Sequence, residues 1–173
     1  SWSLNVSLAA ANAWSANTTV SDPVPIVDTG GSTILLNSGK KYNFMIVPHL
    51  AFISAKNHVS VLDRVKYTQA DVTQGNVANL FGTNEMHVPT SMRDTAAEGV
   101  AFSGSFFFNN VFLGWKPPSA GKKKPSCGYT FIHSMPRVRK YFVDARNANA
   151  IEVEVKIQPK VVASLTGYLI AGV

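Results

Sequence analysis

Three stretches of the chain alternate strictly between apolar residues and polar or small ones. They cover residues 2–8, 100–108 and 151–157. Successive side chains of a strand point to opposite faces of its sheet, so each stretch predicts a β-strand with one buried face. We therefore expect the following apolar side chains to be mostly buried: Trp2, Leu4, Val6, Leu8, Phe102, Phe106, Ile151, Val153, Val155 and Ile157.

Shorter apolar stretches bounded by Gly, Pro or Asn predict further strands. They lie at residues 33–36, 42–47, 50–54, 58–67, 85–88, 111–115, 129–133, 138–143 and 161–170. One helix is expected at residues 72–81, because Asp71 can cap its start and Gly82 stands where it would end. Strands that follow one another without helices between them favour an all-β fold. We predict an antiparallel two-sheet β-sandwich of the jelly-roll kind, with one or two short helices.

The length of 173 residues suits one domain with its own core. We predict a single domain over residues 1–173, with residues 1–32 as an extended strand or arm. Pro23 and Pro25 disfavour a regular central strand there, and Gly30-Gly31 is a turn signal. Cys127 is the one cysteine, so no disulfide can form within the chain. The longest apolar stretch, residues 44–53, is too short to span a bilayer, and we expect no membrane partner.

The formal net charge is +6, and all sixteen Lys and Arg residues lie from Lys40 onward. Two clusters stand out: a lysine run on a loop bounded by Pro and Gly, and a second group beside Tyr141 and Phe142. Such groups suit phosphate neutralisation without sequence readout. The competing interpretation is a basic surface that is simply solvated, with the two aromatic residues in a core. The candidate nucleic-acid contacts, with RNA as the expected ligand, are Lys122, Lys123, Lys124, Arg137, Arg139 and Lys140.

The sequence contains no catalytic motif. The four histidines lack the spacing of a zinc site, and Glu85 with His87 on one side of a strand gives only two ligands. Glu152 and Glu154 would share a strand face with Lys156, which is typical of a solvated face. We predict no enzymatic activity, no metal site and no cofactor.

Charged residues make up 15% of the chain and apolar ones 46%, which leaves neutral surface for permanent subunit contacts. The short strands, the Asn/Thr/Ser/Pro-rich connections, the helix at 72–81 and the last strand at 161–170 resemble the shell domain of coat proteins from small spherical RNA viruses. The resemblance implies an eight-stranded jelly roll. It also implies self-assembly into a closed icosahedral shell around a nucleic-acid genome, and a place in the virion after assembly in the host cell.

One feature departs from those coat proteins, which often carry an Arg-rich N-terminal arm. No basic residue precedes Lys40 here, so positive charge on the rest of the chain would have to face the genome. A capsid component of a DNA virus or phage therefore stays open.

Other functions remain as alternatives. Residues 164–170 resemble the last strand of trimeric jelly-roll ligands of the tumour-necrosis-factor and C1q kind, which implies a secreted receptor- or carbohydrate-binding module. Trp2, Trp14 or Trp115 could form a platform for a sugar, and a basic β-rich chain of this size also suits a pore-forming toxin. Particle size in solution separates a shell, a trimer and a monomer.

Overall fold

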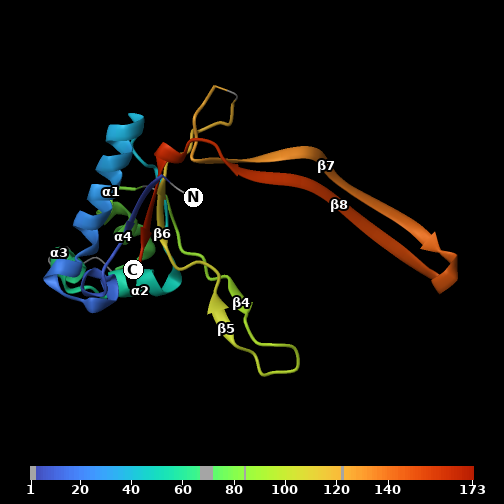
Figure 1. Cartoon of the computed structure of the whole chain (residues 1–173), viewed down its shortest axis with the longest axis horizontal. Coiled ribbons are helices and arrows are strands. Elements are labelled where there is room, and N and C mark those ends of the chain that lie inside the picture. Colours follow the sequence, from blue (N-terminus) through green and yellow to red (C-terminus); the bar gives the residue numbers. More distant parts are fainter. Residues whose placement is uncertain (1–2, 67–71, 84, 122) are drawn as a thin grey trace. The chain divides into compact units, whose positions relative to one another are not determined.

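A computed structural model describes residues 3–66, 72–83, 85–121 and 123–173. The chain forms two compact units (Figure 1). We call residues 1–127 together with 163–173 the body, and residues 128–162 the long hairpin. The long hairpin is not a second domain by this division alone, because a single two-stranded hairpin has no core of its own. One domain over residues 1–173 therefore stays a prediction.

The body is built on a five-stranded mixed sheet in the order β1-β9-β6-β2-β3. Strand β1 pairs parallel with β9, β2 pairs parallel with β3, and β6 runs antiparallel to both β9 and β2. The strands are β1 (Leu4–Ser7), β2 (Phe44–Ile46), β3 (Glu85–His87), β6 (Val111–Gly114) and β9 (Gly167–Ala171).

Helices pack against one face of this sheet. The paired residues Met45, Leu113 and Tyr168 share that face and are buried in the main core. The predicted strand at the N-terminus is confirmed as β1, whose Leu4 and Val6 pack against the same core. The α-helices of the body are α1 (Pro23–Ser38), α2 (His49–Lys56), α3 (Val59–Val65) and α4 (Gln74–Leu80). Short 3-10 turns are η1 (Ala10–Asn12), η2 (Trp14–Ala16), η3 (Thr19–Ser21) and η5 (Ser164–Thr166).

Helix α1 occupies the segment where an arm, a turn and a strand were predicted. The Asp22 carboxylate accepts the Val24 N–H at 3.1 Å and caps the helix. Pro23 and Pro25 stand in the first turn, where a missing N–H costs nothing because that group has no partner within a helix. Gly30 and Gly31 do not form a turn. They are the positions at which helix α1 lies closest to side chains outside it. A Cβ on Gly30 would lie 2.9 Å from Leu113 and Tyr168, so only glycine lets the helix approach the sheet this closely.

The helix predicted at residues 72–81 is confirmed as α4, which is two residues shorter at its start and one at its end. The Thr73 hydroxyl accepts the Asn76 N–H at 3.4 Å and forms the cap. The predicted cap Asp71 lies outside the described residues. Gly82 follows the helix with φ of +68°, the left-handed conformation that favours glycine.

A short hairpin also belongs to the body. It consists of β4 (Met92–Asp94) and β5 (Gly104–Phe106), which pair antiparallel. The Phe106 ring lies 5.7 Å from the His49 ring of α2. The predicted strand at residues 100–108 is thus reduced to its centre, and Phe102 is 67% exposed instead of buried.

The prediction of an all-β jelly-roll sandwich is wrong. The fold is mixed α/β. The described residues are 32% helical and 34% strand, and they form sheets of five, two and two strands with no closed sandwich. Residues 33–36, 50–54 and 59–65 are helical, in α1, α2 and α3, where strands were expected. Short apolar segments do not distinguish a strand from a helix that buries one side, and tertiary packing made that choice here. None of the helices in the described ranges is long and apolar enough to cross a membrane.

Candidate assembly surface

The long hairpin consists of β7 (Gly128–Val143) and β8 (Ala148–Val161), joined by the 3-10 turn η4 (Asp144–Arg146). Asn147 follows the turn in the left-handed region, with φ of +46°. The strands pair antiparallel from Gly128 opposite Val161 to Val143 opposite Ala148. The register shifts between Ile132 and Arg137, where β7 carries extra residues. The strands predicted at 129–133 and 138–143 are therefore parts of one bulged strand.

One face of this hairpin is apolar and exposed to solvent. Alternation along β8 puts Ile151, Val153, Val155 and Ile157 on the same side. Their exposed fractions are 68%, 63%, 48% and 57%, so the predicted burial of these four residues is wrong for the isolated chain. Residues directly opposite one another share a face, which adds Ile132, Val138, Lys140 and Phe142 of β7.

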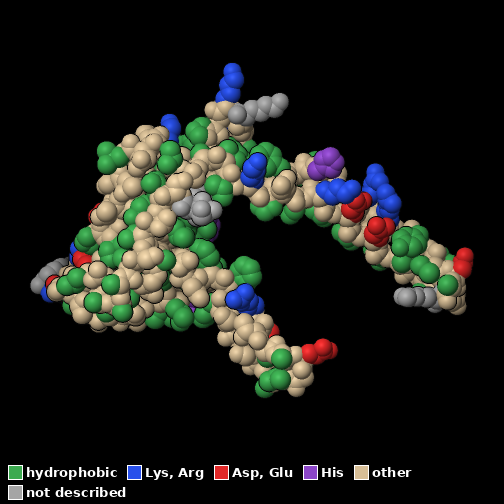
Figure 2. All heavy atoms as spheres, viewed as in Figure 1, with side chains coloured by type: hydrophobic (Ala, Val, Ile, Leu, Met, Phe, Trp, Pro, Cys, Tyr) green, Lys and Arg blue, Asp and Glu red, His purple; other side chains and the backbone are tan. Residues whose placement is uncertain are grey.

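The other face carries the charges. Arg137 lies opposite Glu154, and Arg139 lies opposite Glu152. Lys156 also forms an ion pair with Glu154 at 2.7 Å. Figure 2 shows acidic and basic side chains beside one another along this arm, with hydrophobic side chains also at its surface. Lys160, opposite Tyr129, falls on the same side of β8, so this face holds four cations and two carboxylates.

Exposed apolar residues in such a number are costly. Burying one Val or Ile fully contributes about 1.5–3 kcal/mol. A two-stranded hairpin is marginally stable by itself in water, and packing of its apolar face against another surface is what stabilises such an element. The apolar face therefore has the composition of a contact surface.

The predicted nucleic-acid residues belong to both units. Lys122 lies outside the described residues, while Lys123 is exposed on the body and the Lys124 Nζ donates to the Ser119 hydroxyl at 2.5 Å. Arg137, Arg139 and Lys140 are exposed on the long hairpin, the two arginines on its charged face and Lys140 on its apolar face. Both arginines have a glutamate directly opposite, which weakens their attraction for phosphate.

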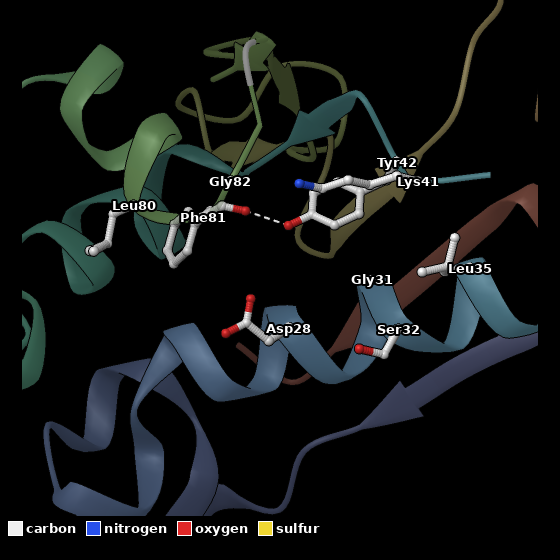
Figure 3. Close-up of a pocket in the computed structure, with 9 residues that line it drawn as sticks. All are labelled: Asp28, Gly31, Ser32, Leu35, Lys41, Tyr42, Leu80, Phe81 and Gly82. Carbon is white, nitrogen blue, oxygen red and sulfur yellow. Dashed lines mark hydrogen bonds between the residues drawn. The ribbon is translucent and has the colours of Figure 1, made fainter.

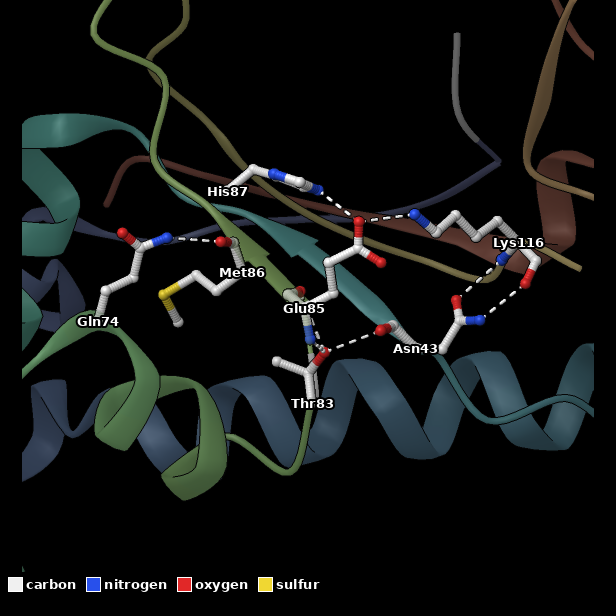
Figure 4. A network of polar contacts seen from close by, with 7 residues as sticks. All are labelled: Asn43, Gln74, Thr83, Glu85, Met86, His87 and Lys116. Atoms are coloured by element: carbon white, nitrogen blue, oxygen red, sulfur yellow. Dashed lines mark hydrogen bonds and ion pairs between the residues drawn. The ribbon is translucent and has the colours of Figure 1, made fainter. Parts of the chain in front are cut away.

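Glu85 and His87 do lie on the same side of β3, as the sequence predicts, but their third partner is a lysine (Figure 4). The Glu85 Oε1 accepts from His87 Nε2 at 2.7 Å and from Lys116 Nζ at 2.6 Å. The hydrogen bonds from Lys116 and then His87 hold the pKa of Glu85 below its ordinary value. Among the described residues no cluster of three or more His, Cys, Asp or Glu could hold a metal. The metal-free interpretation stays a prediction.

A hollow beside Tyr42 combines Asp28 and Ser32 of α1 with Lys41 (Figure 3). The Tyr42 hydroxyl points at the end of α4 and donates to the Phe81 carbonyl. Burial, and secondarily the Asp28 charge, raises the pKa of Tyr42. The phenol is thus held as a structural donor.

The proposed tryptophan platforms have ordinary structural settings. Trp14 is fully buried and stacks on Phe81, with ring centroids 6.1 Å apart. Trp115 is partly buried under the Lys40 ammonium, which lies 5.6 Å from its ring centroid. Trp2 lies outside the described residues. Trp14 is therefore a core residue and cannot offer its face to a sugar.

Comparison with solved structures shows a protein of similar fold. The chain is similar to a phage-related protein from Bordetella bronchiseptica, with a TM-score of 0.85 and 27% sequence identity. The match covers 98% of this chain and 56% of that protein, so the chain spans about half the length of its neighbour. No protein-family model matches the sequence, and no curated protein matches it either.

Proposed function

We propose that the protein is a structural subunit of a phage particle, and that it assembles with copies of itself into a closed coat around nucleic acid. The observation that carries this proposal is the exposed apolar face of the long hairpin, from Ile151 to Ile157 on β8 with Val138 opposite. The likeness to a phage-related protein supports the phage context.

A second copy of the chain is the proposed occupant of the apolar face. Every copy carries one such face, whose isoleucine and valine side chains are exposed in the single chain. In a closed symmetric assembly each copy gives and receives the same contact, so no apolar face is left open. The charged side chains on the opposite face suit exposure to solvent and to salt, where they cost little.

The test compares two substitutions at adjacent positions of β8. Val153→Asn places an amide on the apolar face, and Glu152→Asn places the same amide on the charged face. Loss of one buried valine per contact removes about 2 kcal/mol, so Val153→Asn should shift the protein strongly toward small species. Glu152→Asn should assemble as the unchanged protein does.

The readout is the molar mass from light scattering on a sizing column, with circular dichroism to confirm that both variants keep their strands. The unchanged protein should form species far above the 18.7 kDa of one chain. A strictly monomeric protein over a wide range of concentration and salt would remove the coat-subunit proposal. Equal assembly of both variants would remove the apolar face from it.

A further inference from the structure

Three polar links join residues 17–22 to the start and body of helix α3. The Val59 N–H donates to the Asn17 side-chain oxygen at 2.9 Å. The Ser21 hydroxyl lies 3.0 Å from His58 Nε2. Arg64 donates to both carboxylate oxygens of Asp22, at 2.8 and 3.2 Å. We call this set the N-terminal clasp, because it fastens the segment before α1 to α3.

The central link of the clasp is fully buried, since both Ser21 and His58 have no exposed surface. The Ser21 hydroxyl donates its one hydrogen to the Thr18 carbonyl at 2.9 Å. It must therefore accept at the His58 contact, so Nε2 of His58 carries a hydrogen. The other ring nitrogen, Nδ1, accepts the Ser60 N–H at 3.2 Å and caps α3. In this arrangement Nε2 donates and Nδ1 accepts, which is the hydrogen-bonding pattern of a neutral imidazole.

Protonation of His58 conflicts with this arrangement. A second ring hydrogen on Nδ1 would face the Ser60 N–H, and two donors cannot bond to each other. The helix cap would be lost, and a positive charge would lie in a fully buried position.

The charged groups on the surrounding elements offer little compensation. Asp22 before α1 is paired with Arg64, and Asp63 is paired with Lys66 at 2.5 Å. Lys56 at the end of α2 is itself a cation. The acidic side chains on these elements therefore already have cationic partners, and the basic ones would repel a charged imidazole.

We propose that His58 is a pH-operated latch: acid conditions protonate its ring, break the clasp and release residues 17–21 from α3. The latch is independent of the long hairpin and of the proposed assembly. The test therefore covers about pH 5 to 8, the range in which histidine side chains ordinarily change charge.

Hydrogen exchange at single amides tests the latch on the complete chain. After correction for the intrinsic effect of pH, protection of the hydrogen-bonded amides of Thr18, Ser21 and Ser60 should fall about tenfold between about pH 7.5 and pH 5. His58→Asn should remove this pH dependence, because an Asn oxygen caps a helix without titrating. The control His87→Asn, at an exposed histidine of β3, should leave it in place.

A measurement on the unchanged protein covers the case in which His58→Asn fails to fold. The His58 ring nitrogens and the Ser60 amide are followed by nuclear magnetic resonance across the same pH range. The latch predicts one shared midpoint for ring protonation and loss of amide protection. Protonation of the ring with the amides still protected would overturn it, as would a fall in protection that persists in His58→Asn.

Discussion

The contact between Gly31 and Tyr42 shows how single residues fix the position of α1. A Cβ at Gly31 would lie 2.3 Å from the Tyr42 ring, which is itself held by its hydrogen bond to Phe81. Gly75 in α4 has no neighbour within 4 Å of such a Cβ. The two glycines are therefore a matched pair: both are helical, and only one is needed for packing.

Gly31→Ala should destabilise the fold by about 1–3 kcal/mol, because the added methyl group forces a packed ring to move. Gly75→Ala should be neutral or stabilise the protein by up to about 1 kcal/mol through helix propensity. Urea denaturation followed by circular dichroism measures both. Similar effects of the two substitutions would contradict the packing role of Gly31.

The Glu85 network predicts a small pH-dependent contribution to stability. The pKa of Glu85 is lowered in the folded state, so its contribution is present above the ordinary value of 4.5 and is lost as pH falls through the lower folded value. Glu85→Gln should cost less than about 1 kcal/mol at neutral pH, since the group is exposed and screened.

The stabilities of Glu85→Gln and the unchanged protein should converge at acid pH and in about 1 M salt. Glu98→Gln, at an exposed carboxylate between β4 and β5, is the control. A difference that persists at low pH would show that Glu85 acts through packing and not through its charge.

At the scale of elements, the two basic clusters make different predictions for nucleic-acid binding. Replacing Lys122, Lys123 and Lys124 together with Ala should lower the slope of log affinity against log salt on single-stranded RNA by about 2 if each meets a phosphate. The double change Arg137→Ala and Arg139→Ala should have a smaller effect, because Glu154 and Glu152 lie directly opposite.

Filter binding over a series of salt concentrations provides both slopes. An unchanged slope in the lysine variant would remove that loop from the nucleic-acid interface. A larger effect of the arginine pair than of the lysines would show that the opposite glutamates do not offset their charge.

The sequence correctly predicts those elements that are specified by residues close together in the chain. Strands β1, β2, β3 and β6 and helix α4 fall where alternation, or a cap and a final glycine, indicates them. Helix α1 was not predicted, because Pro25 and Gly30-Gly31 are residues that usually indicate a turn or a break in a helix. Only the side chains of Leu113, Tyr168 and Tyr42, distant in sequence, explain why glycines stand inside this helix.

The sequence predicts the strand that carries the candidate surface, but the predicted burial of its apolar side chains is wrong. Alternation from Ile151 to Ile157 predicts a strand with one apolar face, and β8 has that face. A single sequence does not say whether the covering surface lies in the same chain. The opposite partners of Arg137 and Arg139 likewise depend on the register of the hairpin, which the bulges between Ile132 and Arg137 shift.

At the scale of the whole molecule, one unit has a core and the other does not. The body buries its apolar residues between helices and one face of a mixed sheet. The long hairpin leaves its apolar residues exposed over most of its length. Such a division is expected of a subunit whose final burial is completed by neighbours, and it gives the coat-subunit proposal its central claim: the apolar face is covered on assembly.

Thiol labelling at adjacent positions of β8 tests this claim most directly. The native Cys127 is buried and gives a low background. In the largest species isolated under native conditions, Val153→Cys should react with a water-soluble maleimide at least about tenfold more slowly than Glu152→Cys, because a covered site must open before it reacts. In denaturant the two rates should be equal. Equal rates in the native species as well would show that the apolar face stays open, and would contradict the account.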